Sequence, residues 1–217
     1  MPRILVLSGS NHGFDKCAPL IAAGLQNQSG LEVALVEDKA ILASGQLHDY
    51  DVLVHGSGFT YRQRQPDGTV STLPYLTGEQ EKGLFDFVRN GKGLVGIHGT
   101  AWWIGGEAVD LVGGHANWHP PGLEFGVNVE DPDHPITRGL ADFTVNDEIY
   151  MSAWDPAIHV LATATWADRK HPMAWTHAYG KGKVFFTTLG HGPNTFENQT
   201  VLQLLANACA WAAGPSL

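Results

Sequence analysis

The sequence predicts an α/β fold, in which a parallel sheet carries helices on both faces. Short apolar runs alternate with helical patterns through the first half of the chain, which is the order that βαβ units require. The chain has 217 residues, a length that suits one α/β domain. No repeat, low-complexity tract or linker divides it, so we expect a single domain over residues 1–217.

The first half supplies the strands and helices of this expectation. Apolar runs at residues 3–8, 31–36, 51–55 and 93–98 have the length of buried strands, and helical patterns cover residues 16–28 and 77–90. The second helix opens with Thr77 and has Gln80 three residues on, the spacing of a capping box. Between residues 61 and 72, Pro66-Asp67-Gly68 predicts the turn of a small hairpin.

The second half is dominated by strand-like segments with few helices between them. These segments cover residues 123–129, 148–152, 160–165, 173–178 and 183–188. With few helices between them, these strands are predicted to be mixed or antiparallel additions to the sheet. Asn194, with Glu197 three residues on, predicts the start of a last helix that runs to about Ala213.

Charge and cysteine content narrow the class of partner and the compartment. Thirteen Lys and Arg against twenty-two Asp and Glu give a net charge of −9, which disfavours a nucleic-acid partner. Cys17 and Cys209 lie far apart in helical segments, so a disulfide framework is not expected. We see no signal peptide and no apolar run of the roughly 18 residues that a membrane span needs. We therefore expect a cytoplasmic protein that is not bound to a membrane.

The predicted strand ends carry the candidate site. Four segments that follow strands each hold a histidine and glycines, at residues 8–13, 55–58, 98–103 and 189–192, and the chain has eleven histidines in all. In open parallel sheets the ligand crevice lies beyond the carboxyl ends of the strands. Histidine moves protons near neutral pH and is the commonest metal ligand. The pattern therefore favours a histidine-lined site at this edge.

His98 has the most informative position among them. An apolar strand ends there in a glycine-assisted turn, the place where many α/β enzymes expose a nucleophile. An imidazole at this elbow can act as a base, bind a metal or orient a substrate; the alternative is a buried structural histidine. The elbow has no Gly-x-Ser-x-Gly, and the chain lacks a phosphate-binding P-loop and a dinucleotide fingerprint.

Two further segments carry groups of the same kind. His115 and His119 have the spacing of zinc ligands on a helix, but the glycines and prolines around them predict a loop. In the expected strand at residues 148–152, Glu148 and Tyr150 would share one face. There Glu148 would ligate a metal, orient a histidine or act as a base; the alternative is a solvated acidic turn.

Taken in order, these motifs resemble the ThuA-like (trehalose-utilisation) family over nearly the whole chain. The matching segments are Asn11-His12, Gly96-Ile97-His98-Gly99, Gly113-Gly114-His115 through His119-Pro120, His134-Pro135-Ile136-Thr137-Arg138-Gly139-Leu140, Asp147-Glu148-Ile149-Tyr150, Ala174-Trp175 with Gly180-Lys181-Gly182-Lys183-Val184, Leu189-Gly190-His191 and Ala210-Trp211-Ala212. The resemblance implies a flavodoxin-like, class I glutamine amidotransferase-like three-layer sandwich, with a mostly parallel central sheet and added antiparallel strands.

The resemblance also implies a role in carbohydrate metabolism, on trehalose, related disaccharides or their keto-sugars. His98 stands where the amidotransferases have a cysteine, so glutamine hydrolysis through a thiolate is excluded. Carried over by motif, the catalytic candidates are His98, Glu148, His12 and His191, and the candidates for sugar binding are His119, Trp102, Trp103, Tyr150 and Asn11. His12, His98, His191 and Glu148 are also the candidate ligands of a divalent metal, zinc or manganese.

Three functions follow from these candidates. The first is an enzyme in which His98 and Glu148 act as an acid–base pair on a sugar, with or without a metal, in a hydrolase, lyase or isomerase reaction. The second is a sugar-binding or regulatory module without catalysis. The third and weakest is a hydrolase that uses Thr100 as its nucleophile. Exposed tryptophans would permit a homo-oligomer.

Overall fold

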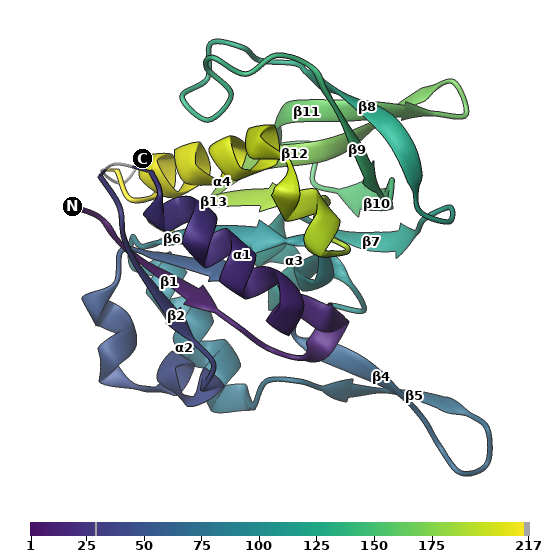
Figure 1. Ribbon diagram of the computed structural model, residues 1–217. Helices are drawn as coiled ribbons and strands as arrows, with labels where there is room; N and C mark the ends of the chain where they lie inside the picture. Colours follow the sequence, from purple (N-terminus) through teal and green to yellow (C-terminus); the bar gives the residue numbers. More distant parts are fainter. Residues whose placement is uncertain (29, 215–217) are drawn as a thin grey trace.

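The computed structural model describes residues 1–28 and 30–214, and it has three layers (Figure 1). A central sheet carries α1 and α4 on one face and α2 and α3 on the other. This arrangement is the predicted three-layer α/β sandwich. No helix in the described part of the chain is long and apolar enough to cross a membrane.

Helices and strands alternate in the first half of the chain, and strands dominate the second half. The helices are α1 (Phe14–Gln26), α2 (Gly78–Arg89), α3 (Glu107–Val112) and α4 (Gln199–Ala212). The strands are β1 (Arg3–Leu7), β2 (Glu32–Val36), β3 (Val52–His55), β4 (Thr60–Arg64), β5 (Val70–Pro74), β6 (Gly93–Ile97), β7 (Gly114–Trp118), β8 (Leu123–Val129), β9 (Phe143–Asp147), β10 (Met151–Trp154), β11 (His159–Trp166), β12 (Arg169–Tyr179) and β13 (Gly182–Thr187).

Nine of these strands form the central sheet, in the order β2-β1-β3-β6-β13-β12-β11-β8-β9. The first five are parallel, and from β13 onward each strand is antiparallel to its neighbour. The predicted mostly parallel sheet with antiparallel additions is confirmed. Because β1, β3, β6 and β13 are parallel neighbours, the loops that follow them meet at one edge, as the sequence predicts. The predicted hairpin is also present, as β4 and β5.

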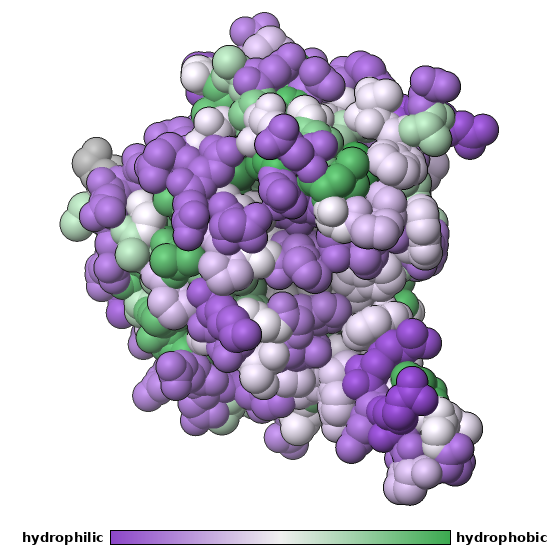
Figure 2. All heavy atoms as spheres, turned by 45° about the vertical axis from the view of Figure 1, so that its right-hand side comes forward, coloured by the Kyte–Doolittle hydropathy of each residue, from purple (hydrophilic) through white to green (hydrophobic). Residues whose placement is uncertain are grey.

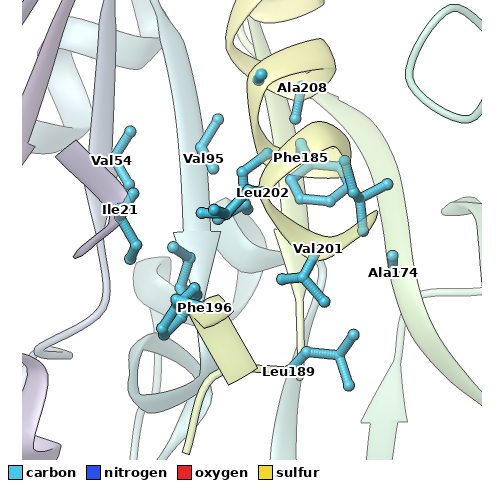
Figure 3. Close-up of a cluster of buried hydrophobic side chains, with 14 of the residues drawn as sticks. Ile21, Val54, Val95, Ala174, Phe185, Leu189, Phe196, Val201, Leu202 and Ala208 are labelled. Carbon is cyan, nitrogen blue, oxygen red and sulfur yellow. The ribbon is translucent and has the colours of Figure 1, made fainter. Parts of the chain in front are cut away.

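Apolar side chains fill both spaces between the sheet and its helices. Figure 3 shows the cluster on the α1 and α4 side, where Ile21 and Leu202 from the helices meet Val54, Val95 and Phe185 from the strands. A second cluster lies between the other sheet face, α2 and α3. These residues belong to the apolar runs and the helical apolar patterns of the sequence.

Three local predictions are wrong. Residues 148–150 form no strand and instead connect β9 to β10, because the pairing with β8 ends at Asp147. Asn194 does not begin the last helix: it lies in a 3-10 turn, and Asn198 caps α4 by accepting from the Thr200 amide. Residues 114–118 form strand β7 rather than a loop, since β10 supplies a partner that is distant in sequence.

One glycine of α2, Gly83, should be less stable as alanine, although alanine has the higher helix propensity. Exchanging glycine for alanine inside a helix usually stabilises it by up to about 1 kcal/mol. At Gly83, however, a Cβ would lie 1.9 Å from the Leu42 carbonyl oxygen. We expect Gly83→Ala to lower the free energy of unfolding by about 1–3 kcal/mol, measured by urea denaturation. Gly78→Ala, where a Cβ meets nothing within 4 Å, is the matched control and should cause no loss. Equal stability of the two variants would contradict the prediction.

Candidate functional site

Residues from four separate segments meet at the carboxyl edge of the parallel strands. His12 follows β1, His98 follows β6, His191 follows β13, and Glu148 follows β9 from the antiparallel side of the sheet. This edge is on the right of Figure 1, and it comes forward in Figure 2, where the surface is mostly hydrophilic. The structure therefore brings together the four residues predicted to be catalytic.

His98 is held in one orientation by the backbone. Its φ of 40° places the residue in the left-handed region directly after β6, which aims the ring above the sheet edge. Its Nδ1 lies 2.7 Å from the Thr188 carbonyl oxygen. A carbonyl only accepts, so Nδ1 carries the hydrogen and Nε2 keeps a free lone pair. Burial lowers the pKa of His98 well below its usual range, and the ring is neutral at pH 7.

Glu148 is the centre of a cluster that it forms with His98, His119 and His191. Its Oε2 lies 3.5 Å from His98 Nε2 and 3.4 Å from His119 Nε2, and its Oε1 lies 3.0 Å from His191 Nδ1. The side chain is 8% exposed. Burial raises the pKa of Glu148, while His191 and His119 oppose this shift. A buried carboxylate with a raised pKa and three imidazoles around it is suited to taking up and releasing a proton.

His119 and His191 are the two histidines of the cluster that solvent reaches. Their side chains are 31% and 63% exposed, whereas that of His98 is 4% exposed. His119 Nδ1 donates to the Pro120 carbonyl at 2.8 Å, so its Nε2 also keeps a lone pair. A ligand at this edge can therefore contact these two rings directly.

Asp147 positions the cluster, although it is not among the candidates predicted from the sequence. Its buried carboxylate accepts from the amides of Glu148 at 2.8 Å, Gly190 at 2.8 Å and His191 at 3.2 Å, and from Thr195 Oγ1 at 2.6 Å. Burial raises the pKa of Asp147, and these four donors oppose the shift. One side chain thus fixes both Glu148 and the loop that carries His191. The alternation of Phe143, Val145 and Asp147 along β9 is the signal that places this carboxylate inward.

His12 lies beside the cluster on the β1 side. Its ring stacks on Trp103 at 5.2 Å between centroids and meets the edge of His98 at 6.5 Å. Burial lowers its pKa to about 4, and its buried Nε2 has no hydrogen-bond partner among the described residues. Gly99 lets the His12 ring lie close to the backbone after β6, because a Cβ at Gly99 would lie 2.6 Å from that ring.

The predicted sugar-binding aromatic residues divide into two groups. Tyr150 is fully buried, and its hydroxyl accepts a hydrogen bond from Trp102 Nε1. The centre of its ring lies 4.8 Å from that of His98 and 5.9 Å from that of His119, so Tyr150 packs against both histidines. Trp102 and Trp103 are half-buried and border the site.

Two other histidines at this edge lie outside the cluster. His55 is fully buried, where its Nε2 donates to the Gly58 carbonyl and its ring meets the edge of Phe59. His115 lies on β7, paired with Ala153 of β10. The spacing of His115 and His119 therefore does not produce a shared ligand pair, and only His119 reaches Glu148.

Three of the four candidate metal ligands lie close enough together to hold a divalent cation. His98, Glu148 and His191 each offer one ligand atom, and these atoms lie within 4.8 Å of one another. The free Nε2 of His98, oriented by a carbonyl on the opposite ring nitrogen, has the arrangement that metal-bound histidines have. His12 does not belong to this set of three.

A cavity of about 550 Å³ borders the site on the β1 side. It is lined by Ser10, Asn11, Lys39, Tyr61, Arg62, Pro74 and Tyr75. Asn11 precedes His12, and its amide nitrogen donates to the carbonyls of Ser57 and Thr60. Asn11 therefore ties the loop after β1 to the start of β4, and the β4–β5 hairpin forms one wall of the cavity.

A family model matches the sequence, and several solved structures have a similar fold. A family model named ThuA, described as trehalose utilisation, matches residues 3–212. No curated protein matches the chain. A ThuA-like protein from Bacteroides uniformis has a TM-score of 0.74 at 18% identity, over 98% of this chain and 91% of that chain.

Two other solved structures have a similar fold. A protein from Salmonella typhimurium described as cytoplasmic has a TM-score of 0.67 at 17% identity, over 97% of this chain and 99% of that chain. A β-galactosidase from Bacillus circulans has a TM-score of 0.65 at 13% identity, over 97% of this chain but 31% of that chain. Identities this low show a shared fold alone.

Proposed function

The chain belongs to the ThuA family of trehalose utilisation, and from this premise we propose that it is an enzyme that moves a proton beside the ketone of an oxidised disaccharide. The observation that carries the proposal is the environment of Glu148. A buried carboxylate with a raised pKa contacts three imidazoles, two of which have a lone pair on the nearest nitrogen. The family membership supports a carbohydrate substrate, and the residues around Glu148 support a proton transfer.

In the proposed reaction Glu148 is the base. Its carboxylate takes the proton from the carbon next to the ketone, and the C–H electron pair forms the enolate. The Nδ1 of His191 lies 3.0 Å from Glu148 Oε1. In the tautomer with its hydrogen on Nε2, His191 would donate from Nε2 to the developing oxyanion. In a β-elimination the enolate electron pair then forms the new C=C bond, and the glycosidic C–O bond on the neighbouring carbon breaks. The departing oxygen takes the proton that Glu148 holds and leaves as an alcohol. In an isomerisation Glu148 instead returns the proton to the former carbonyl carbon, and the hydroxyl on the deprotonated carbon becomes the new ketone.

A divalent cation is the second form that we propose for this centre. Held by His98, His191 and Glu148, it would polarise the ketone oxygen as a Lewis acid. Glu148 would then be a ligand, and the free Nε2 of His119 would be the base. Elemental analysis of untagged protein purified without chelator distinguishes the two forms. Near-stoichiometric zinc or manganese that is lost in His98→Asn supports the cation form, because asparagine keeps a donor to Thr188 but lacks Nε2.

The substrate assay tests the proposed function. We expect the wild-type protein to consume trehalose in which one ring hydroxyl is oxidised to a ketone, and to leave trehalose itself unchanged, as followed by NMR. His159, which pairs with Asp131 away from the cluster, provides the control His159→Ala with unchanged turnover. Binding of the keto-sugar without consumption would overturn the enzyme proposal and favour a sugar-binding module. We also propose a cytoplasmic location, as described for the Salmonella typhimurium structure.

A further inference from the structure

The cavity beside the site has an unusual charge for this protein. Two of its lining residues, Lys39 and Arg62, are cations, and none is acidic. The whole chain has thirteen Lys and Arg against twenty-two Asp and Glu. A net charge of −9 repels an anionic ligand at long range, so a local pair of cations is needed to hold one.

Both cations are available to a ligand. Neither Lys39 nor Arg62 forms an ion pair with a carboxylate of the described residues. Lys39 is half-buried, with its ammonium 3.9 Å from the centre of the Tyr75 ring and a hydrogen bond to the Tyr75 carbonyl. Arg62 is exposed on β4, in the hydrophilic hairpin at the lower right of Figure 2.

Aromatic contacts connect the cavity to the cluster around Glu148. The Arg62 guanidinium lies 5.3 Å from the centre of the Trp103 ring, and Trp103 stacks on His12. Thr60 Oγ1 donates to the Trp103 carbonyl at 2.9 Å, which holds the start of β4 against the same loop. A ligand that spans the cavity and the cluster therefore has cations at one end and Glu148 at the other.

We propose that this cavity binds an anionic group, a phosphate or a carboxylate, carried by the sugar. The substrate class is then an acidic derivative of a keto-sugar, and this inference rests on the proposed function. Arg and Lys both bind phosphate and carboxylate through charge-assisted hydrogen bonds, and the hydroxyls of Ser10, Tyr61 and Tyr75 at the cavity wall add neutral donors. A neutral sugar would leave both cations without a negatively charged partner.

Calorimetric titration with four probes tests the proposal: glucose, glucose 6-phosphate, glucuronate and inorganic phosphate. Hydrogen bonds to charged groups are stronger than neutral ones, so we expect an acidic sugar to bind at least about tenfold more tightly than glucose. The two acids separate phosphate from carboxylate as the source of the anion. Arg62→Gln should remove most of this preference, as should Lys39→Gln. Arg64→Gln, two residues along β4 and outside the cavity lining, should retain it.

Two results would overturn the inference: equal binding of glucose and both acids, or an anion preference that persists in Arg62→Gln combined with Lys39→Gln. Lys39 bonds the carbonyl of Tyr75, directly after β5, so Lys39→Gln could disturb the local structure there. Arg62 is exposed, and Arg62→Gln alone then remains informative. Binding is measured without turnover, and Glu148→Gln should keep the anion preference. An anion preference in a protein that consumes no keto-sugar would therefore contradict the proposed function alone. Faster turnover of neutral than of acidic keto-sugars would contradict this inference alone.

Discussion

Replacing Glu148 by glutamine is expected to lower turnover of the keto-disaccharide by a factor of about 10²–10⁴, the range that a positioned acid or base contributes. Glutamine keeps the size of the side chain and cannot take up the proton. The fold should be retained, because burial raises the pKa of Glu148 and the ionised form is the costly one to bury. We therefore expect a melting temperature no lower than that of the wild type.

The control for this variant is Glu124→Gln. Glu124 lies exposed on β8, on the antiparallel part of the sheet, and is not a member of the cluster. Its variant should keep both turnover and melting temperature. Turnover in Glu148→Gln within about threefold of the wild type would remove Glu148 from the reaction, since a lost base costs far more than that.

Replacing Asp147 by asparagine is expected to destabilise the protein by about 2–5 kcal/mol, because each buried donor left without an acceptor costs about 1–3 kcal/mol. The Asp147 carboxylate accepts from three amides and from Thr195, and an asparagine side chain has one oxygen for these four donors. Loss of this bonding frees the loop with Gly190 and His191, so turnover should fall as well.

Thermal unfolding followed by circular dichroism measures the effect of Asp147→Asn. For a chain of this length, 1 kcal/mol corresponds to about 2–4 °C in melting temperature, so we expect a drop of roughly 5–15 °C. Asp142→Asn is the matched control: this exposed carboxylate accepts from the Val129 amide and from Asn128, and its loss should cost less than about 1 kcal/mol. An unchanged melting temperature for Asp147→Asn would show that the carboxylate does not hold the cluster together.

The parallel half of the fold could be predicted from the sequence because its signals are local. The runs that become β1, β3 and β6 are mostly apolar, and strands buried on both faces have that composition. The run that becomes β13 is predicted as a strand among the mixed or antiparallel additions, and its parallel pairing with β6 emerges from the structure. The glycine-assisted turn at His98 also lies within a few residues of its strand. Topology then brings the loops after these strands to one edge, so three of the site histidines follow from the strand prediction.

The rest of the site depends on pairings distant in sequence. Glu148 lies directly after β9 and is not part of a strand, and the end of β9 is set by its pairing with β8. His119 reaches the cluster because β7 pairs with β10, an interaction that the glycines and prolines around it conceal. Most of the hydrogen bonds that Asp147 accepts come from backbone amides, which do not depend on residue type and so leave no pattern in the sequence. Motif resemblance predicts its neighbour Glu148, whereas the role of Asp147 emerges only from the structure.

The most direct test of proton removal by this cluster is deuterium exchange into the keto-disaccharide in D₂O, followed by NMR. If the cluster takes the proton beside the ketone, wild-type protein should replace the hydrogen on that carbon with deuterium, in recovered substrate or in product. Glu148→Gln should exchange no faster than the sugar without protein. A wild-type protein that neither exchanges nor consumes the keto-sugar, or a Glu148→Gln variant that exchanges at the wild-type rate, would contradict the account.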